Sequence, residues 1–255
     1  MLSTLLYWRC LLGKIFQIYA AEGKRTVILS AGMFTQDFMF LALYWILFNN
    51  FESLGGWRLK DAALLFGISV TAIGLILFLC RGLIMLPYKI YDGSIDIYLA
   101  RPRHPLVDLT FGTASFASLG DILCGLVLIA YASQGFSWAQ GLLCLFLVIL
   151  GAVIFWASLL VFYCIPFWLL NAQRLSDQLF EMMIIASFNM LHGQPLGIKI
   201  ILFTLVPAGF VAYLPTLLLM EFDPLFLALI MMAAVFYAFL AVKIFESGVR
   251  RYLRG

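Results

Sequence analysis

Long runs of apolar residues alternate with short polar segments along this chain. A helix that crosses a bilayer needs about 20 mostly apolar residues, because the hydrocarbon core is roughly 30 Å thick and each helical residue rises about 1.5 Å. Runs of this kind lie at 26–48, 62–86, 109–132, 138–166 and 225–245. They predict an all-α membrane protein in which residues 1–255 form a single transmembrane domain. Pro166 is expected to end or kink the fourth run, since proline breaks helices.

The pattern is broken between residues 171 and 223, and two interpretations fit it. In the first, 175–192 crosses the membrane as a short fifth helix, and 196–220 enters and leaves on one side as a re-entrant hairpin. In the second, 179–192 lies on the membrane surface and 198–220 crosses. Both interpretations give six spans and the same sidedness.

Closely spaced prolines favour the re-entrant hairpin. Irregular backbone at membrane depth is tolerated only where protein or a water-filled cavity satisfies its polar groups. The residues that mark the hairpin are Pro195, Pro207, Gly209 and Pro215. We therefore expect six transmembrane helices, with the hairpin before the last of them.

The N-terminal segment, 1–25, has a different pattern from the later runs. Its apolar and aromatic residues recur at three- and four-residue spacing, and they are Leu5, Trp8, Leu12, Ile15, Phe16 and Tyr19. The polar residues Arg9, Lys14 and Glu22 fall largely off that stripe. This periodicity predicts an amphipathic helix that lies in the membrane interface. The alternative is an N-terminal extension of the first span.

Basic residues predict the orientation of the spans, because short loops rich in Lys and Arg stay on the cytoplasmic side. One set of segments holds Arg9, Lys14, Lys24, Arg25, Arg81, Lys89, Arg101, Arg103, Arg174, Lys243, Arg250, Arg251 and Arg254. The other set holds only Arg58, Lys60 and Lys199. Both termini and the loop 87–108 are therefore expected in the cytoplasm. The loops at 49–61, 133–137 and 221–224 are expected outside.

Composition supports the membrane class. The chain has 255 residues, of which 64% are hydrophobic and 11% charged, whereas soluble domains are about half apolar and about a quarter charged. The net charge of +3 is small and gives no indication of a nucleic-acid partner. The five cysteines form no C-x-x-C pair and have no histidine cluster beside them. We interpret them as small buried apolar residues and expect no metal site.

The common catalytic motifs are missing from the sequence. It has no G-x-x-x-x-G-K-[ST] phosphate-binding loop, no H-E-x-x-H zinc motif and no G-x-S-x-G nucleophile elbow. The two histidines, His104 and His192, lie far apart in sequence. We therefore expect no enzyme activity and no cofactor in this chain. A transport or scaffold role remains, with energy supplied from elsewhere.

Four ionisable residues within or beside the apolar runs are candidate functional sites, namely Asp37, Arg81, Asp121 and Glu181. Charged groups inside a membrane are costly, so those that persist often line a substrate path or a proton relay. The alternative is packing between helices through interior hydrogen bonds. Arg81 lies near the cytoplasmic end of its run and can extend toward the interface. An ion-coupled secondary transporter that uses Asp37 or Asp121 is the alternative function.

The cytoplasmic loop carries the most informative pattern. Asp92-Gly93 is a turn signal, and Ser94 is expected to cap a short helix that Pro102 ends. Ile95, Tyr98 and Leu99 would then share one face of that helix. A short helix that projects from two spans into the cytoplasm is a suitable lever for a soluble partner. The alternative is an ordinary solvated loop.

Three segments carry a resemblance to a known family. The loop fits the pattern G-x-[IL]-D-x-[YL]-L-x-[RK]-P with Gly93, Ile95, Asp96, Tyr98, Leu99, Arg101 and Pro102. Residues 195–198 and 206–215 are similar to P-L-x-I … [IV]-P-x-x-[FV]-x-x-[YV]-x-P, and 245–252 is similar to a closing G-[LV]-[RK]-x-Y tail. In this order, they resemble the six-span branch of ABC-2-type transporter permeases, of about 260 residues. The serine-rich end usual in that tail is absent, because the sequence given stops at Gly255.

The resemblance implies a membrane subunit of an ATP-binding cassette transporter in the bacterial inner membrane. It implies two kinds of partner: a second permease, identical or related, and ABC ATPase subunits that bind ATP and Mg. Residues 92–102 would be the element that couples the chain to the ATPase, so Asp92 and Ser94 belong to the coupling set. An interfacial N-terminal helix and an outer re-entrant hairpin are also typical of the branch. Export of a hydrophobic or amphipathic substrate is expected, although no residue selects among substrates.

Overall fold

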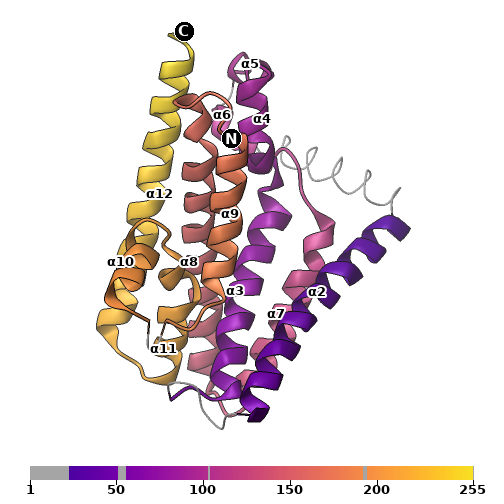
Figure 1. The fold of residues 1–255 in the computed structure, drawn as a ribbon, viewed down its shortest axis with the longest axis vertical. Coiled ribbons are helices and arrows are strands. Elements are labelled where there is room, and N and C mark those ends of the chain that lie inside the picture. The colour runs from indigo at the N-terminus through magenta and orange to yellow at the C-terminus, as the bar shows by residue number, and fades with distance from the viewer. Residues whose placement is uncertain (1–22, 51–55, 103, 192–193, 255) are drawn as a thin grey trace.

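The computed structural model describes residues 23–50, 56–102, 104–191 and 194–254. Within these residues the chain is helical and contains no strand (Figure 1). The predicted all-α class is therefore confirmed. Residues 1–22 lie outside the described residues, and so does most of the predicted interfacial helix.

The long helices are α2 (Gly23–Asn50), α3 (Leu59–Leu79), α7 (Leu119–Ala132), α8 (Trp138–Tyr163), α9 (Gln173–Ser187) and α12 (Pro224–Tyr252). The short ones are η1 (Arg81–Met85), α4 (Leu86–Tyr91), α5 (Asp96–Leu99), α6 (Pro105–Phe111), η2 (Phe116–Ser118), η3 (Ile165–Phe167), α10 (Leu196–Thr204), η4 (Gly209–Tyr213) and α11 (Leu214–Met220). In Figure 1, α4 to α6 lie at the same end of the molecule as the C-terminus, whereas α10 and α11 lie in the opposite half.

Among the described residues, four helices are long and apolar enough to cross a membrane: α2, α3, α8 together with η3, and α12. Two further pairs pass the same test together but are bent, α6 with α7 by 60° and α10 with α11 by 86°. The chain is therefore an integral membrane protein with four to six candidate spans. Helix α9, which covers much of the predicted run 175–192, has only 15 residues.

Two predicted runs differ from the helices that form. The run 62–86 is not continuous, because α3 ends at Leu79 and the tighter helix η1 follows. The run 109–132 is divided by a break between Phe111 and Phe116. The break contains Gly112 and Ser115. The Ser115 amide donates a hydrogen bond to the Phe78 carbonyl of α3 at 3.2 Å, and Arg81 of η1 donates one to Ser115 Oγ at 2.6 Å. Glycine and serine interrupt the apolar run because they favour turns over helix.

Helix α3 is buried along most of its length, and α7 packs closely against it. Glycines make this approach feasible. A Cβ atom on Gly125 would lie 2.2 Å from Thr71 Oγ1 and 2.8 Å from the Gly67 carbonyl oxygen. Small residues at such contacts let two membrane helices approach closely enough for dispersion contacts to hold them together.

Helix α2 lies apart from the bundle toward its N-terminal end (Figure 1). Asp37 is its only buried residue among those described. Contacts to the bundle are local: Ser30 Oγ donates to the Phe116 carbonyl at 2.8 Å, and the Tyr44 hydroxyl donates to the Phe188 carbonyl at 2.5 Å. The remaining surface of α2 is largely exposed and apolar.

The proline-interrupted segment folds as two helices with a sharp bend between them. Helix α10 ends at Thr204, and a π-helical turn, η4, leads into α11. The Tyr237 hydroxyl of α12 donates to the carbonyls of Phe203 and Thr204 at 3.0 and 2.9 Å. These bonds satisfy backbone groups at the end of α10 that the bend would otherwise leave unpaired. The bend thus depends on contacts with a distant helix as well as on Pro207.

Candidate functional site

The loop between α4 and α6 is held by a local turn. The Ser94 amide donates to Asp92 Oδ1 at 2.9 Å, and Gly93 adopts a left-handed backbone with φ 75°. Hydrogen bonds from Ser94 hold the pKa of Asp92 below its ordinary value, since they favour the ionised carboxylate. The predicted cap by Ser94 is wrong, because α5 begins at Asp96 without a side-chain cap. Asp92 organises the turn instead, because a carboxylate accepts backbone N–H bonds readily.

Tyr98 fixes the inner face of α5. The Lys89 ammonium donates to the Tyr98 hydroxyl at 2.8 Å, and the Arg101 guanidinium carbon lies 4.9 Å from the ring centroid. Arg101 also pairs with the buried Asp108 of α6 at 3.0 Å. These contacts join α4, α5 and α6 into one unit.

The two faces of α5 differ in burial. Ile95, just before the helix, is 0% exposed, and Tyr98 and Leu99 pack against the core as partly buried residues. The predicted shared face of Ile95, Tyr98 and Leu99 therefore exists. Ile97, which the sequence reasoning did not single out, is 61% exposed on the other face. Ile97 lies between Asp96 and Tyr98, off the face that Ile95, Tyr98 and Leu99 share, and this position is the signal that the sequence offered.

The C-terminal segment 245–252 contacts this loop through Tyr252. A Cβ atom on Gly93 would lie 3.8 Å from the Tyr252 hydroxyl, and the Asp96 carboxylate also lies beside that hydroxyl. The Tyr252 ring lies 6.2 Å from the ring of Phe167, in η3 directly after Pro166. The Phe167 ring also lies against Gly248, where a Cβ atom would be only 2.3 Å from it. Two of the three family-like segments, far apart in sequence, are thus packed against each other.

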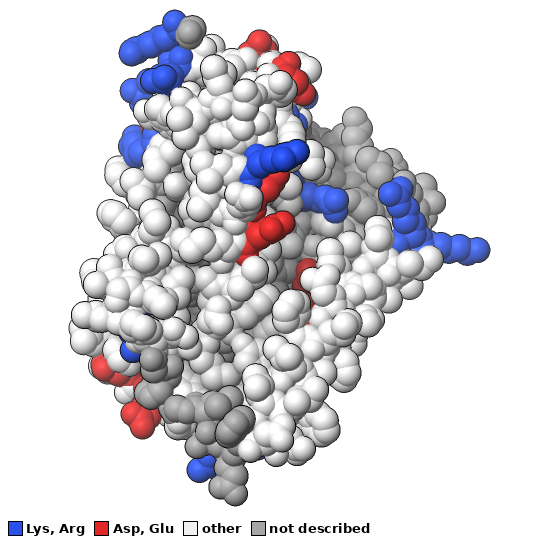
Figure 2. Space-filling view, in the orientation of Figure 1, with Lys and Arg blue, Asp and Glu red and all other residues white. Residues whose placement is uncertain are grey.

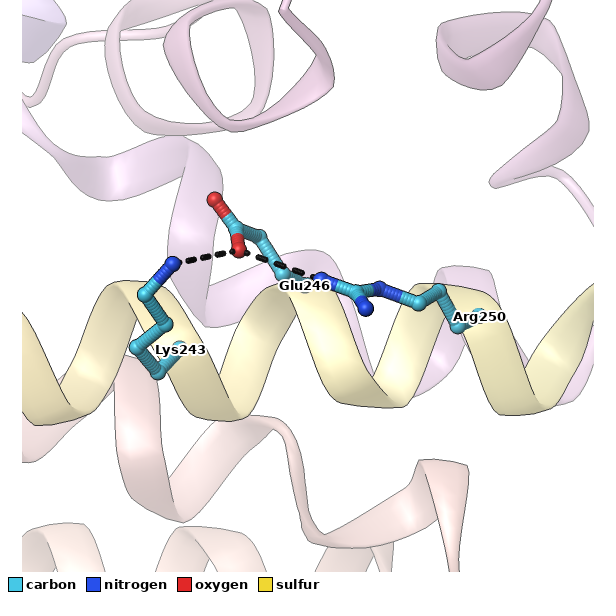
Figure 3. Close-up of polar contacts among 3 residues, drawn as sticks. All are labelled: Lys243, Glu246 and Arg250. Carbon is cyan, nitrogen blue, oxygen red and sulfur yellow. Dashed lines mark hydrogen bonds and ion pairs between the residues drawn. The ribbon is translucent and has the colours of Figure 1, made fainter.

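The end of α12 beside this loop is strongly basic. Glu246 forms ion pairs with Lys243 at 3.2 Å and with Arg250 at 3.5 Å, one turn before and after it (Figure 3). Arg250 and Arg251 lie in the last turn, where positive charge is favourable at a helix C-terminus. Figure 2 shows blue side chains gathered at this end of the molecule. The sequence predicts that this end faces the cytoplasm.

A second candidate site is a cavity of about 590 Å³ between α2, α3, α7 and α9. It brings together Asp37, Asp121 and Glu181, three of the ionisable residues that the sequence singled out, and adds Asp177. Figure 2 shows acidic side chains within the groove that separates α2 from the bundle. Arg81 does not line this cavity and instead bonds to Ser115.

The fold and the sites define a class: an integral membrane protein with a braced loop at its basic end and an acidic cavity between helices. Residues 32–254 match the family model described as "ABC-2 family transporter protein". Because the match covers most of the chain, the protein belongs to the ABC-2 transporter family, and the resemblance drawn from the three segments is confirmed. Membrane permeases of this family generally work with ABC ATPase subunits. No curated protein and no solved structure matches the chain.

Proposed function

We propose that this chain is the membrane-spanning permease subunit of an ATP-driven exporter, whose substrate is hydrophobic or amphipathic. A separate ABC ATPase would bind ATP and Mg and hydrolyse the nucleotide, so this chain itself would catalyse no reaction. The braced loop 92–102 carries the proposal. It presents Ile97 outward while its inner face is tied to the flanking helices.

The bracing supports a lever mechanism. Movement imposed on α5 passes through Tyr98 and Arg101 to α4 and α6, and through Tyr252 to α12. A rigid connection is needed, because a flexible loop would absorb the motion of an ATPase instead of transmitting it. We further propose that a second permease, identical or related, completes the translocation path.

The proposed topology has six spans and cytoplasmic termini in a bacterial inner membrane. Helix α9 would be the short fifth span, and α10 and α11 the re-entrant hairpin from the outer side. The 86° bend and the place of both short helices in the half away from the C-terminus support this arrangement (Figure 1). An interfacial helix in the first 25 residues remains part of the proposal.

An ion-coupled secondary transporter is the second candidate. The shared cavity of Asp37 and Asp121 is the observation in its favour, since two carboxylates in one membrane cavity suit proton exchange. Family membership weighs against it, because the family works with ATPases.

Co-purification tests the proposed function. The tagged chain, extracted from its native membrane in mild detergent, is expected to retain an ABC ATPase at one copy per permease. Intact-complex mass spectrometry gives the stoichiometry, and ATP hydrolysis by the complex gives its activity. A tagged chain that purifies without any ATPase, yet remains folded, would contradict the proposal.

A further inference from the structure

The acidic cavity has the size and lining of a ligand site. Its volume of about 590 Å³ falls within the range of small-molecule pockets, about 300–1,000 Å³. The walls are mainly apolar and aromatic, with Phe40, Phe180 and Phe188 among them. Acidic side chains reach it from three different helices: Asp37 from α2, Asp121 from α7, and Asp177 and Glu181 from α9.

Asp37 is the residue that points to a ligand. It is 7% exposed, and its Oδ2 atom has no hydrogen-bond partner among the described residues. A buried polar atom without a partner is costly, so such atoms are rare unless something else satisfies them. Asp37 is also the only buried residue of α2 among those described, so the helix turns this carboxylate, and not an apolar side chain, toward the bundle.

The charge of the lining is one-sided. No lysine or arginine lines the cavity within the described part of the chain, so no basic side chain there offsets the carboxylates of Asp37 and Asp121. Asp177 differs from these two, because it accepts a hydrogen bond from the Tyr88 hydroxyl at 2.6 Å. A lining of this kind favours a positively charged ligand.

The distribution of the acidic side chains over three helices indicates what kind of cation fits the cavity. No group of three or more potential ligating side chains is close enough to hold a metal ion among the described residues. A larger cation can contact one carboxylate while its apolar parts lie against the aromatic walls. The faces of aromatic rings attract organic cations through the negative charge density of the ring.

We infer that this cavity binds a hydrophobic organic cation, whose charge pairs with Asp37 and whose apolar groups contact the rings of α2 and α9. The inference deepens the proposed function and rests on it, since it names the substrate class of the permease. Figure 2 shows a groove between α2 and the rest of the bundle. The inference includes entry of an amphipathic cation from the membrane through this groove.

Binding of tetraphenylphosphonium to the full chain in lipid nanodiscs tests the inference. Tetraphenylborate, which has the same shape and the opposite charge, is the matched control ligand. We expect saturable binding of tetraphenylphosphonium and none of tetraphenylborate above that of empty nanodiscs. Asp37→Asn should weaken binding of the cation by at least about tenfold, because the substitution removes the charge and keeps the shape.

Two further variants separate charge from folding. Asp37→Glu keeps the carboxylate and should bind within a few-fold of the original chain. Glu221→Gln removes an exposed carboxylate that does not line the cavity and should change nothing. Equal binding of the two ions, or full binding by a folded Asp37→Asn chain, would overturn the inference.

This measurement needs no ATPase, so its outcome is separate from that of the proposed function. A chain that binds the cation but retains no ATPase would contradict only the permease assignment. A chain that retains the ATPase but does not discriminate between the two ions would contradict only the substrate class.

Discussion

Replacing Ile97 with lysine is expected to abolish ATP-driven transport while the permease stays folded. Ile97 is 61% exposed, so the substitution disturbs little inside this chain. If the ATPase covers this residue, burial of the isoleucine contributes about 1.5–3 kcal/mol to docking. Losing that amount weakens the ATPase's affinity by about ten- to a hundredfold, and a desolvated lysine charge weakens it further. Retention of the ATPase in detergent and ATP-dependent transport in inverted vesicles are the two measurements.

A lysine at another exposed site is the control for this prediction. Leu170 is 92% exposed between η3 and α9, outside the loop 92–102. Leu170→Lys should keep both docking and transport, and Ile97→Val should keep most of each. The loop is a better target at Ile97 than at Leu99, because Leu99 packs against the core and its change would disturb the fold. If Ile97→Lys docks and transports normally, the coupling role of the loop is wrong.

Gly125→Val is expected to cause the largest loss of stability. A Cβ atom at Gly125 would lie 2.2 Å from Thr71 Oγ1 and 2.8 Å from the Thr71 amide nitrogen, closer than real contacts allow. Helices α3 and α7 must separate to admit valine, and overpacking of this kind costs about 1–3 kcal/mol or more. Because α7 also carries Asp121, the separation would distort the acidic cavity. Thermal unfolding in detergent measures the loss.

Gly141→Val provides the matched comparison, since Gly141 lies in α8 and no atom lies within 4 Å of where a Cβ atom would be. Both substitutions place valine in a helix, so the intrinsic helix propensities cancel. The midpoint of unfolding should fall by several degrees for Gly125→Val and hardly change for Gly141→Val. Equal shifts for the two variants would show that the close α3–α7 contact does not stabilise the bundle.

The apolar pattern predicts the long helices well, because a helix that crosses lipid must be mostly apolar over about 20 residues. Helix α8 begins at Trp138 and ends at Tyr163, shortly before Pro166, which the sequence predicts to end or kink this run. Pattern alone could not place the break between Phe111 and Phe116, because glycine and serine also occur inside continuous helices such as α3. Hydrogen bonds of Ser115 with Phe78 and Arg81, more than thirty residues earlier, hold that break in place. Such tertiary contacts do not appear in a local window of sequence.

The candidate site likewise combines features that local sequence predicts with features that only tertiary packing creates. The turn at Asp92-Gly93 and the buried face of α5 follow from local spacing. The choice of Asp92 over Ser94 as the organising side chain depends on the backbone path, which the sequence does not specify. The contact of Tyr252 with the loop, and the meeting of Asp37 with Asp121, depend on helix packing. Their sequence separations are large, so only the folded bundle brings them together.

Transport by reconstituted vesicles tests the central claim, that this chain moves its substrate with energy from a separate ATPase. Proteoliposomes would hold the chain either alone or with its co-purified ATPase, and labelled tetraphenylphosphonium would report movement. We predict transport only when the ATPase, ATP and Mg are all present, and no transport by the chain alone under a pH gradient. Transport by the chain alone, driven by the pH gradient without ATP, would contradict the account.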